Sequence, residues 1–185
     1  MQNKSEQYKD AKATSYSDVP AGGYVVEVSD VTDMPNKEYL RIELDIVEGE
    51  YANYYSDLFS RAGFWGLTLY KSYKDKSLGW FKDFMETLEK CNDGFEWDWD
   101  EKKLIGCTFG AVLREEEYQG NDGTVKSSLK VDKYCSVQDI HEGNFTVKPV
   151  KKLAGTAPST GVVNKSASAQ AKPDFKEIPD DNIPF

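Results

Sequence analysis

The sequence contains few of the residues, and none of the short motifs, from which most catalytic and metal sites are built. Its three cysteines, Cys91, Cys107 and Cys135, lie far apart without a C-x-x-C pair, and its single histidine is His141. We therefore expect free thiols in a reducing cytoplasm, and a histidine that faces solvent in a loop after the last strand. Because no G-x-S-x-G, Walker or H-E-x-x-H motif is present, we expect a protein that is not an enzyme and uses no metal or cofactor.

Long apolar segments are absent as well. The chain has no run of 18 or more apolar residues, which a membrane-spanning helix would need. Its first 18 residues are polar and lack the apolar centre of a secretory signal. These absences predict a protein without a membrane partner.

Positive charge is scarce for a nucleic-acid-binding protein. The net charge is −9, and residues 149–185 contain five lysines and four acids, so that residues 1–148 carry 18 basic against 28 acidic residues, a net charge of −10. This balance argues against a simple basic nucleic-acid binder. Any nucleic-acid site must be a local basic groove on an acidic body.

Period-2 alternation is the clearest pattern in the chain. Residues 22–34 are rich in valine and predict a strand, and residues 37–49 predict a second strand joined to it by a turn at 34–37. In the second strand Leu40, Ile42, Leu44 and Ile46 alternate with Tyr39, Arg41, Glu43 and Asp45. The first set is expected in the core and the second set in solvent.

The remaining elements follow the same reasoning. Residues 64–73 predict a third strand, residues 77–94 a helix capped by Ser77, and residues 104–118 and 125–137 two strands joined by a hairpin turn at 119–124. On the helix, Trp80, Phe81, Phe84, Met85 and Leu88 are expected in the core. This order predicts an all-β fold with one helix: an OB-fold, a five-stranded Greek-key barrel with its helix between strands three and four.

The composition divides the chain into four parts. We expect a flexible arm at 1–19, the OB-fold domain at 20–148, a flexible linker at 149–173 that is rich in Ala, Ser, Thr, Gly, Pro and Lys, and an acidic tip at 174–185. Dimer and tetramer both remain open, because nothing in the sequence fixes the symmetry.

Aromatic residues, 13% of the chain, suggest a binding surface. Single-stranded nucleic acids bind where exposed aromatic faces stack on bases and cations follow the phosphates. The stretch 61–76 carries four basic residues against one acid, and the stretch 127–134 carries two lysines against one acid. The candidate DNA-binding residues are Tyr39, Arg41, Trp65, Tyr70, Lys71, Tyr73, Lys74, Lys76, Arg114, Lys126, Lys130, Lys133 and Tyr134.

The C-terminal tip is the most specific motif. Its residues Asp180, Asp181, Ile183, Pro184 and Phe185 resemble the tip of bacterial and bacteriophage single-stranded DNA-binding proteins, and the segment 102–137 looks like the corresponding hairpin of phage members. The resemblance implies an OB-fold that coats single-stranded DNA in a bacterial host cytoplasm. It also implies a flexible linker, and a tip that docks on replication or recombination proteins such as a helicase, primase, recombinase or polymerase.

Two other functions fit the sequence. An acidic OB-fold adaptor would use the tip without binding DNA, and it would be favoured if Arg41, Lys71, Lys74, Lys130 and Lys133 were scattered over opposite faces. A metal-dependent nuclease would use the carboxylates of 97–101 and 114–118 to hold Mg²⁺ or Mn²⁺.

Overall fold

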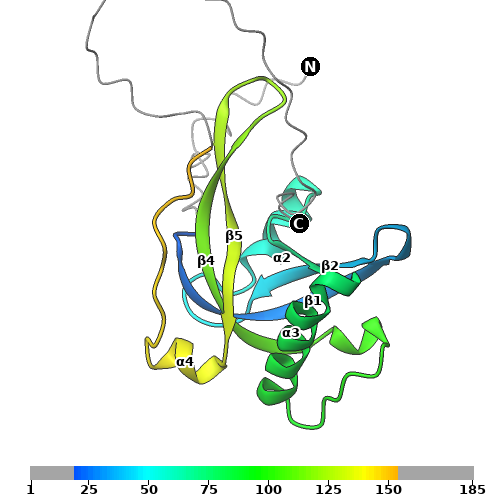
Figure 1. Ribbon diagram of the computed structural model, residues 1–185. Helices are drawn as coiled ribbons and strands as arrows, with labels where there is room; N and C mark the ends of the chain where they lie inside the picture. Colours follow the sequence, from blue (N-terminus) through cyan, green and yellow to red (C-terminus); the bar gives the residue numbers. More distant parts are fainter. Residues whose placement is uncertain (1–18, 154–185) are drawn as a thin grey trace, which may run out of the picture.

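The computed structural model describes residues 19–153, and its centre is a single antiparallel sheet (Figure 1). The five strands are β1 (Gly22–Met34), β2 (Tyr39–Ile46), β3 (Thr68–Ser72), β4 (Thr108–Gln119) and β5 (Val125–Cys135). They lie in the order β3-β2-β1-β4-β5, and every pairing is antiparallel. The five predicted strands are confirmed and the sheet is compatible with the predicted all-β class, but the prediction of a single helix was wrong, because the described residues form three α-helices.

The sheet is open along one line. Its edge strands are β3 and β5, and within residues 19–153 no ladder of backbone hydrogen bonds joins them. The described residues therefore form a curved sheet and not a hydrogen-bonded closed barrel. We call the line along which β3 and β5 approach each other the seam.

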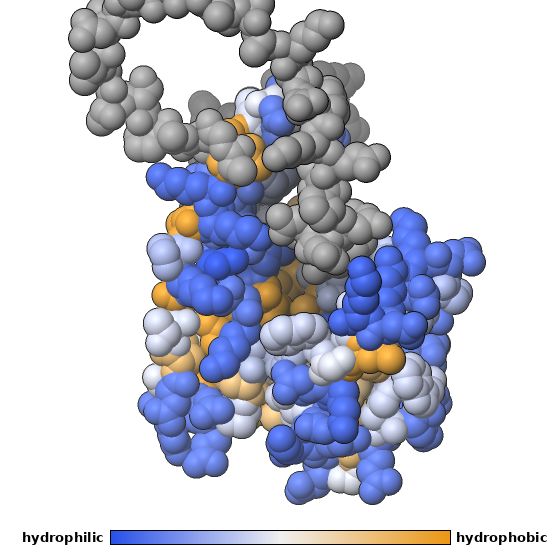
Figure 2. Space-filling view, in the orientation of Figure 1, coloured by the Kyte–Doolittle hydropathy of each residue, from blue (hydrophilic) through white to orange (hydrophobic). Residues whose placement is uncertain are grey.

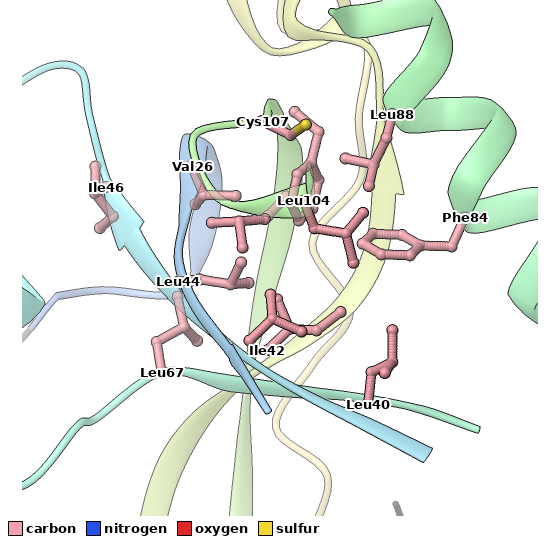
Figure 3. Packing of buried hydrophobic residues seen from close by; sticks show 14 of the residues in the cluster. Val26, Leu40, Ile42, Leu44, Ile46, Leu67, Phe84, Leu88, Leu104 and Cys107 are labelled. Carbon is pink, nitrogen blue, oxygen red and sulfur yellow. The ribbon is translucent and has the colours of Figure 1, made fainter. Parts of the chain in front are cut away.

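The alternation in β2 supplies one wall of the core. Leu40, Ile42, Leu44 and Ile46 are buried as predicted, and they belong to one cluster that Phe84 enters from the helix (Figure 3). Their burial contributes about 1.5–3 kcal/mol each relative to exposure.

The prediction for Asp45 was wrong, because its carboxylate is buried. Asp45 Oδ1 accepts hydrogen bonds from the backbone N–H groups of Ile46 and Tyr55, each at 2.9 Å, and Oδ2 accepts one from Ser56 N at 3.0 Å and one from the Ser56 hydroxyl. Three of these four donors lie in the first turn of α2 (Tyr54–Ala62), a helix that the sequence analysis did not predict. A buried carboxylate is stable here because it satisfies the otherwise unpaired donors at a helix start.

The predicted helix is α3 (Leu78–Cys91), and its buried stripe is Phe81, Phe84, Met85 and Leu88. Trp80 was expected in the core, but 73% of its surface is exposed. It lies about 100° around the helix from Phe81, at the edge of the buried stripe. Ser77 precedes the helix but makes no side-chain capping hydrogen bond.

The β4–β5 hairpin extends beyond the rest of the sheet (Figure 1). In the same orientation, Figure 2 shows a surface that is mostly hydrophilic, with smaller hydrophobic patches. Beyond β5 a short helix, α4 (Val137–His141), stands where a loop was predicted, and its His141 faces solvent and contacts Glu48 at 2.6 Å. The chain then returns along β4, where Lys151 exchanges backbone hydrogen bonds with Glu115 and Glu117, each at 2.9 Å. The first residues of the predicted linker, 149–153, therefore lie against the hairpin.

Candidate nucleic-acid interface

Two neighbouring strands bring aromatic rings and a cation together on the outer face of the sheet. Tyr39 and Arg41 lie on β2, and Tyr70 lies directly opposite Arg41 on β3. The rings of Tyr39 and Tyr70 meet edge to face, with 5.6 Å between their centroids. Arg41 is exposed and pairs with Glu43 at 3.2 Å. We call Tyr39, Arg41 and Tyr70 the outer patch, since the buried side chains of β2 point to the opposite face.

The seam contains two other predicted DNA-binding residues, Lys71 and Tyr134. Lys71 is only 8% exposed, because it alternates with Tyr70 and Ser72 and points inward. Its ammonium lies 4.9 Å from the ring centroid of Phe84 and 4.6 Å from that of Tyr134. In this position the Lys71 ammonium is held among aromatic rings and is not presented to a phosphate.

Helix α3 completes the seam. The Tyr134 hydroxyl lies 3.5 Å from Lys71 Nζ, and it donates to Asp83 Oδ2 at 3.0 Å or to Trp80 O at 3.3 Å. Burial lowers the pKa of Lys71 to about 8, against the raising effect of Asp83. Burial and the hydrogen bond with Asp83 raise the pKa of Tyr134. Asp83 is a residue that the sequence analysis missed, because its partner lies 51 positions away in the chain.

Two predicted lysines of β5 lie outside the seam. Lys133 precedes the inward-pointing Tyr134, and Lys130 stands opposite Arg114 on the outer face of the hairpin; both lysines are exposed. Lys71 of β3 and Tyr134 of β5 point inward and meet at the seam. Their chain neighbours, Tyr70 on β3 and Lys133 on β5, therefore point to the outer side of the sheet beside the seam. Lys133 thus lies on the outer side of β5 next to the seam, and Lys130 lies three residues earlier on the same strand.

Arg114 is already engaged with carboxylates. It pairs with Glu116 at 2.8 Å and with Asp132 at 3.2 Å, and these acids also pair with Lys151 and Lys148. Burial alone would raise the pKa of Glu116, but Arg114 and Lys151 hold it below its ordinary value. These ion pairs attach the segment 148–151 to the β4–β5 hairpin, so Arg114 has a structural role.

The remaining predicted residues lie in different surroundings. Trp65 is half-buried and donates from Nε1 to Leu44 O at 2.9 Å, and Tyr73 donates to Asp33 Oδ1 at 2.8 Å. Lys74 and Lys76 are exposed between β3 and α3, and Lys126 is exposed beside the hairpin turn, where it pairs with Asp122 at 3.0 Å. Of the thirteen residues, the structure brings Tyr39, Arg41 and Tyr70 into one patch, with Lys130 and Lys133 beyond the seam.

Lys37 is a cation that the sequence analysis did not select. It is exposed in the turn between β1 and β2, two residues before Tyr39. Its place in the loop that leads into the outer patch is the signal that could have identified it.

One carboxylate in each of the two clusters proposed for a nuclease is paired with a cation. Lys103 contacts Asp98 at 2.5 Å and holds the pKa of that carboxyl below its ordinary value, and Glu116 belongs to the network around Arg114. Between residues 19 and 153, no three His, Cys, Asp or Glu side chains gather closely enough to hold a metal ion. The three cysteines are free thiols, as predicted.

The tip residues Asp180, Asp181, Ile183, Pro184 and Phe185 lie outside the described residues. In the described range no helix is long and apolar enough to cross a bilayer. The chain matches no family model, and no curated protein is similar to it in sequence.

Proposed function

We propose that this protein binds single-stranded DNA without sequence preference, through the outer patch and the lysines beside it. The observation that carries the proposal is the meeting of Tyr39, Arg41 and Tyr70 on β2 and β3. Aromatic rings offer stacking surfaces to any base, and cations between them follow the backbone phosphates. Because neither interaction selects a base, the binding is independent of sequence.

The strand order supports an OB-fold as the scaffold. Strands one, two and three pair in sequence, β4 pairs with β1, and α3 follows β3 and precedes β4 in the chain. This order is compatible with a five-stranded Greek-key barrel. We propose that the side chains at the seam take the place of the missing β3–β5 ladder. OB-folds bind oligonucleotides on the face of strands two and three and on the loops 1–2 and 4–5. Lys37 and Lys126 lie in or beside the corresponding loops.

The C-terminal tip supports a second part of the proposal, the recruitment of replication or recombination proteins. In the sequence, Phe185 offers an apolar ring, and Asp180 and Asp181 before it offer two carboxylates. A partner with a small apolar pocket and a basic rim would take these groups. Such a protein would act in phage or prophage DNA metabolism in the cytoplasm of a bacterial host.

Both parts can be tested with one pair of proteins. The full chain and a variant that ends at Pro179 are compared for binding to a 30-nucleotide oligo-dT, to the same length of duplex, and to host proteins in a pull-down. We expect both proteins to prefer the single strand, and only the full chain to capture a partner. Partner capture without DNA binding would favour the adaptor, and Mg²⁺-dependent digestion of the oligonucleotide would favour the nuclease.

A further inference from the structure

The acidity of the body is concentrated in one stretch of the chain. Residues 83–101, which include most of α3 and the connector after it, contain eight acids and one lysine, a net charge of −7. The outer patch contributes none of these residues. Most of the net charge that argues against a nucleic-acid site therefore lies in this stretch of the chain and not in the outer patch.

Five residues of this stretch, Met85, Glu86, Glu89, Trp97 and Trp99, line a groove of about 360 Å³, which we call the α3 groove. One wall is the stripe of α3 that runs from Leu78 through Phe81 and Met85 to Glu89, and the other wall is Trp97 and Trp99. From Leu78 to Glu89 the helix rises about 16 Å, the length of about five residues of extended chain.

Aromatic faces line the groove and one of them is open to solvent. Trp99 stacks on Phe81, with 5.8 Å between the ring centroids and an angle of 14° between the planes. Trp97 contacts both rings at 5.7 and 5.9 Å. Although Trp99 makes these contacts, it remains 65% exposed, so that an indole face is available beside the groove.

The connector that carries the tryptophans is fixed to the helix. Trp97 N donates to Glu89 Oε1 at 3.0 Å, and Trp99 adopts a positive φ of 71°, which turns the chain at this point. These contacts hold the two walls together in the unbound protein. A ligand would therefore meet a preformed groove.

Carboxylates accompany the aromatic walls. Glu86 and Glu89 line the groove, and the single cation that lines it, Lys82, is exposed and pairs with Glu86 at 3.6 Å. Tryptophan faces attract cations through their quadrupole, and neighbouring carboxylates strengthen that attraction. The groove is thus complementary to a short segment that carries both apolar and positively charged side chains.

We propose that the α3 groove binds a basic, partly apolar segment of a partner protein, with an arginine or lysine of that segment against Trp99 and Glu86. No groove residue belongs to the outer patch, so that the partner and DNA occupy separate surfaces of opposite charge. The proposal does not depend on the C-terminal tip or on DNA binding.

The test uses the full chain and a fluorescein-labelled octapeptide of alternating arginine and leucine, followed by fluorescence anisotropy at low salt. We expect saturable binding that Trp99→Ala and Glu86→Gln each weaken about 5-fold or more, and that Trp99→Phe largely retains. Glu50→Gln removes the same charge from an exposed turn and should leave the affinity within about 2-fold. The corresponding glutamate–leucine peptide should not bind.

Three results would overturn the proposal. The first is a Trp99→Ala variant that melts like the parent protein and binds the peptide with unchanged affinity. The second is a loss of peptide affinity in Glu50→Gln equal to that in Glu86→Gln, which would indicate non-specific attraction by net charge. The third is self-association of the full chain that Trp99→Ala abolishes in sedimentation, since the occupant of the groove would then be a second copy of this chain.

Discussion

Lys71 of β3 and Tyr134 of β5 approach to 3.5 Å across the two open edges of the sheet. The pair lies over Phe84, and Asp83 of α3 is bonded to the same tyrosine hydroxyl. Side chains therefore connect the edges where backbone hydrogen bonds do not. This connection places the outer faces of β3 and β5, with Tyr70 and Lys133, beside one another.

Burial of Lys71 predicts a specific dependence of stability on pH. The pKa of Lys71 is about 8 in the folded protein and 10.5 when the side chain is exposed to water, as in the unfolded chain. Between pH 8 and pH 10.5, Lys71 therefore binds fewer protons in the folded protein than in the unfolded chain. Its contribution to the free energy of unfolding therefore rises with pH in this window, by about 3 kcal/mol in all. Burial raises the pKa of the Cys91, Cys107 and Cys135 thiols, which acts in the opposite direction above pH 9.

Comparing the parent protein with a Lys71→Met variant separates the contribution of Lys71 to the pH dependence of stability from that of the other titratable groups. We expect the free energy of urea unfolding of the parent protein, minus that of Lys71→Met, to increase from pH 8 to pH 10. Lys90→Met removes the same charge from an exposed position of α3 and is the matched control. A parent-minus-Lys71→Met difference that stays flat would show that Lys71 is not buried at the seam.

Tyr70 tests base stacking on the outer patch. Replacing it with alanine removes one stacking surface worth about 1–3 kcal/mol, so Tyr70→Ala should weaken binding to oligo-dT by about 5- to 150-fold. Tyr70→Phe keeps the ring and should bind within about 2-fold of the parent protein. Fluorescence anisotropy measures both, and equal affinities for the alanine and phenylalanine variants would contradict a stacking role.

Lys130 and Lys133 test whether the β5 lysines contact phosphates. Each phosphate contact with a single strand contributes about −0.7 to the slope of log affinity against log salt. We expect the double alanine variant to bind more weakly and to have a slope smaller in magnitude by about 1.4. Lys90→Ala serves as the matched control on α3. The same slope in the double variant and the parent protein would exclude these lysines from the interface.

Asp45 tests the attachment of α2. Asp45→Ala leaves the donors of Tyr55 and Ser56 without their carboxylate, and should destabilise the fold by about 2–4 kcal/mol. Asp57→Ala, which removes an exposed carboxylate in the same turn of the helix, should cost less than about 1 kcal/mol. Thermal and urea unfolding measure both, and similar losses would contradict the capping role.

The strands and helices that the sequence predicted correctly are those whose buried residues recur at a regular spacing within the element. The alternation from Leu40 to Ile46 and the spacing from Phe81 to Leu88 predicted β2 and α3, because each pattern expresses one buried face. Helix α2 was missed because its start is capped by Asp45, ten residues earlier, and its N-cap residue Asn53 makes no side-chain bond.

The candidate site was predicted only in part for the same reason. Tyr39, Arg41 and Tyr70 could be identified because strand alternation places them on the outer face. The burial of Lys71 depends on Phe84 and Tyr134, which lie 13 and 63 residues away, and no local pattern contains that contact. A lysine beside aromatic residues in the sequence can lie on either face of a strand pair until its distant neighbours are known.

The most direct test of single-stranded DNA binding is a titration at low salt. Fluorescein-labelled oligo-dT of 30 nucleotides is titrated with the full chain, and its anisotropy is followed. We predict saturable binding that weakens steeply as salt is raised, and much weaker binding to duplex of the same length. A folded protein that leaves the anisotropy of the oligonucleotide unchanged at low salt would contradict the account.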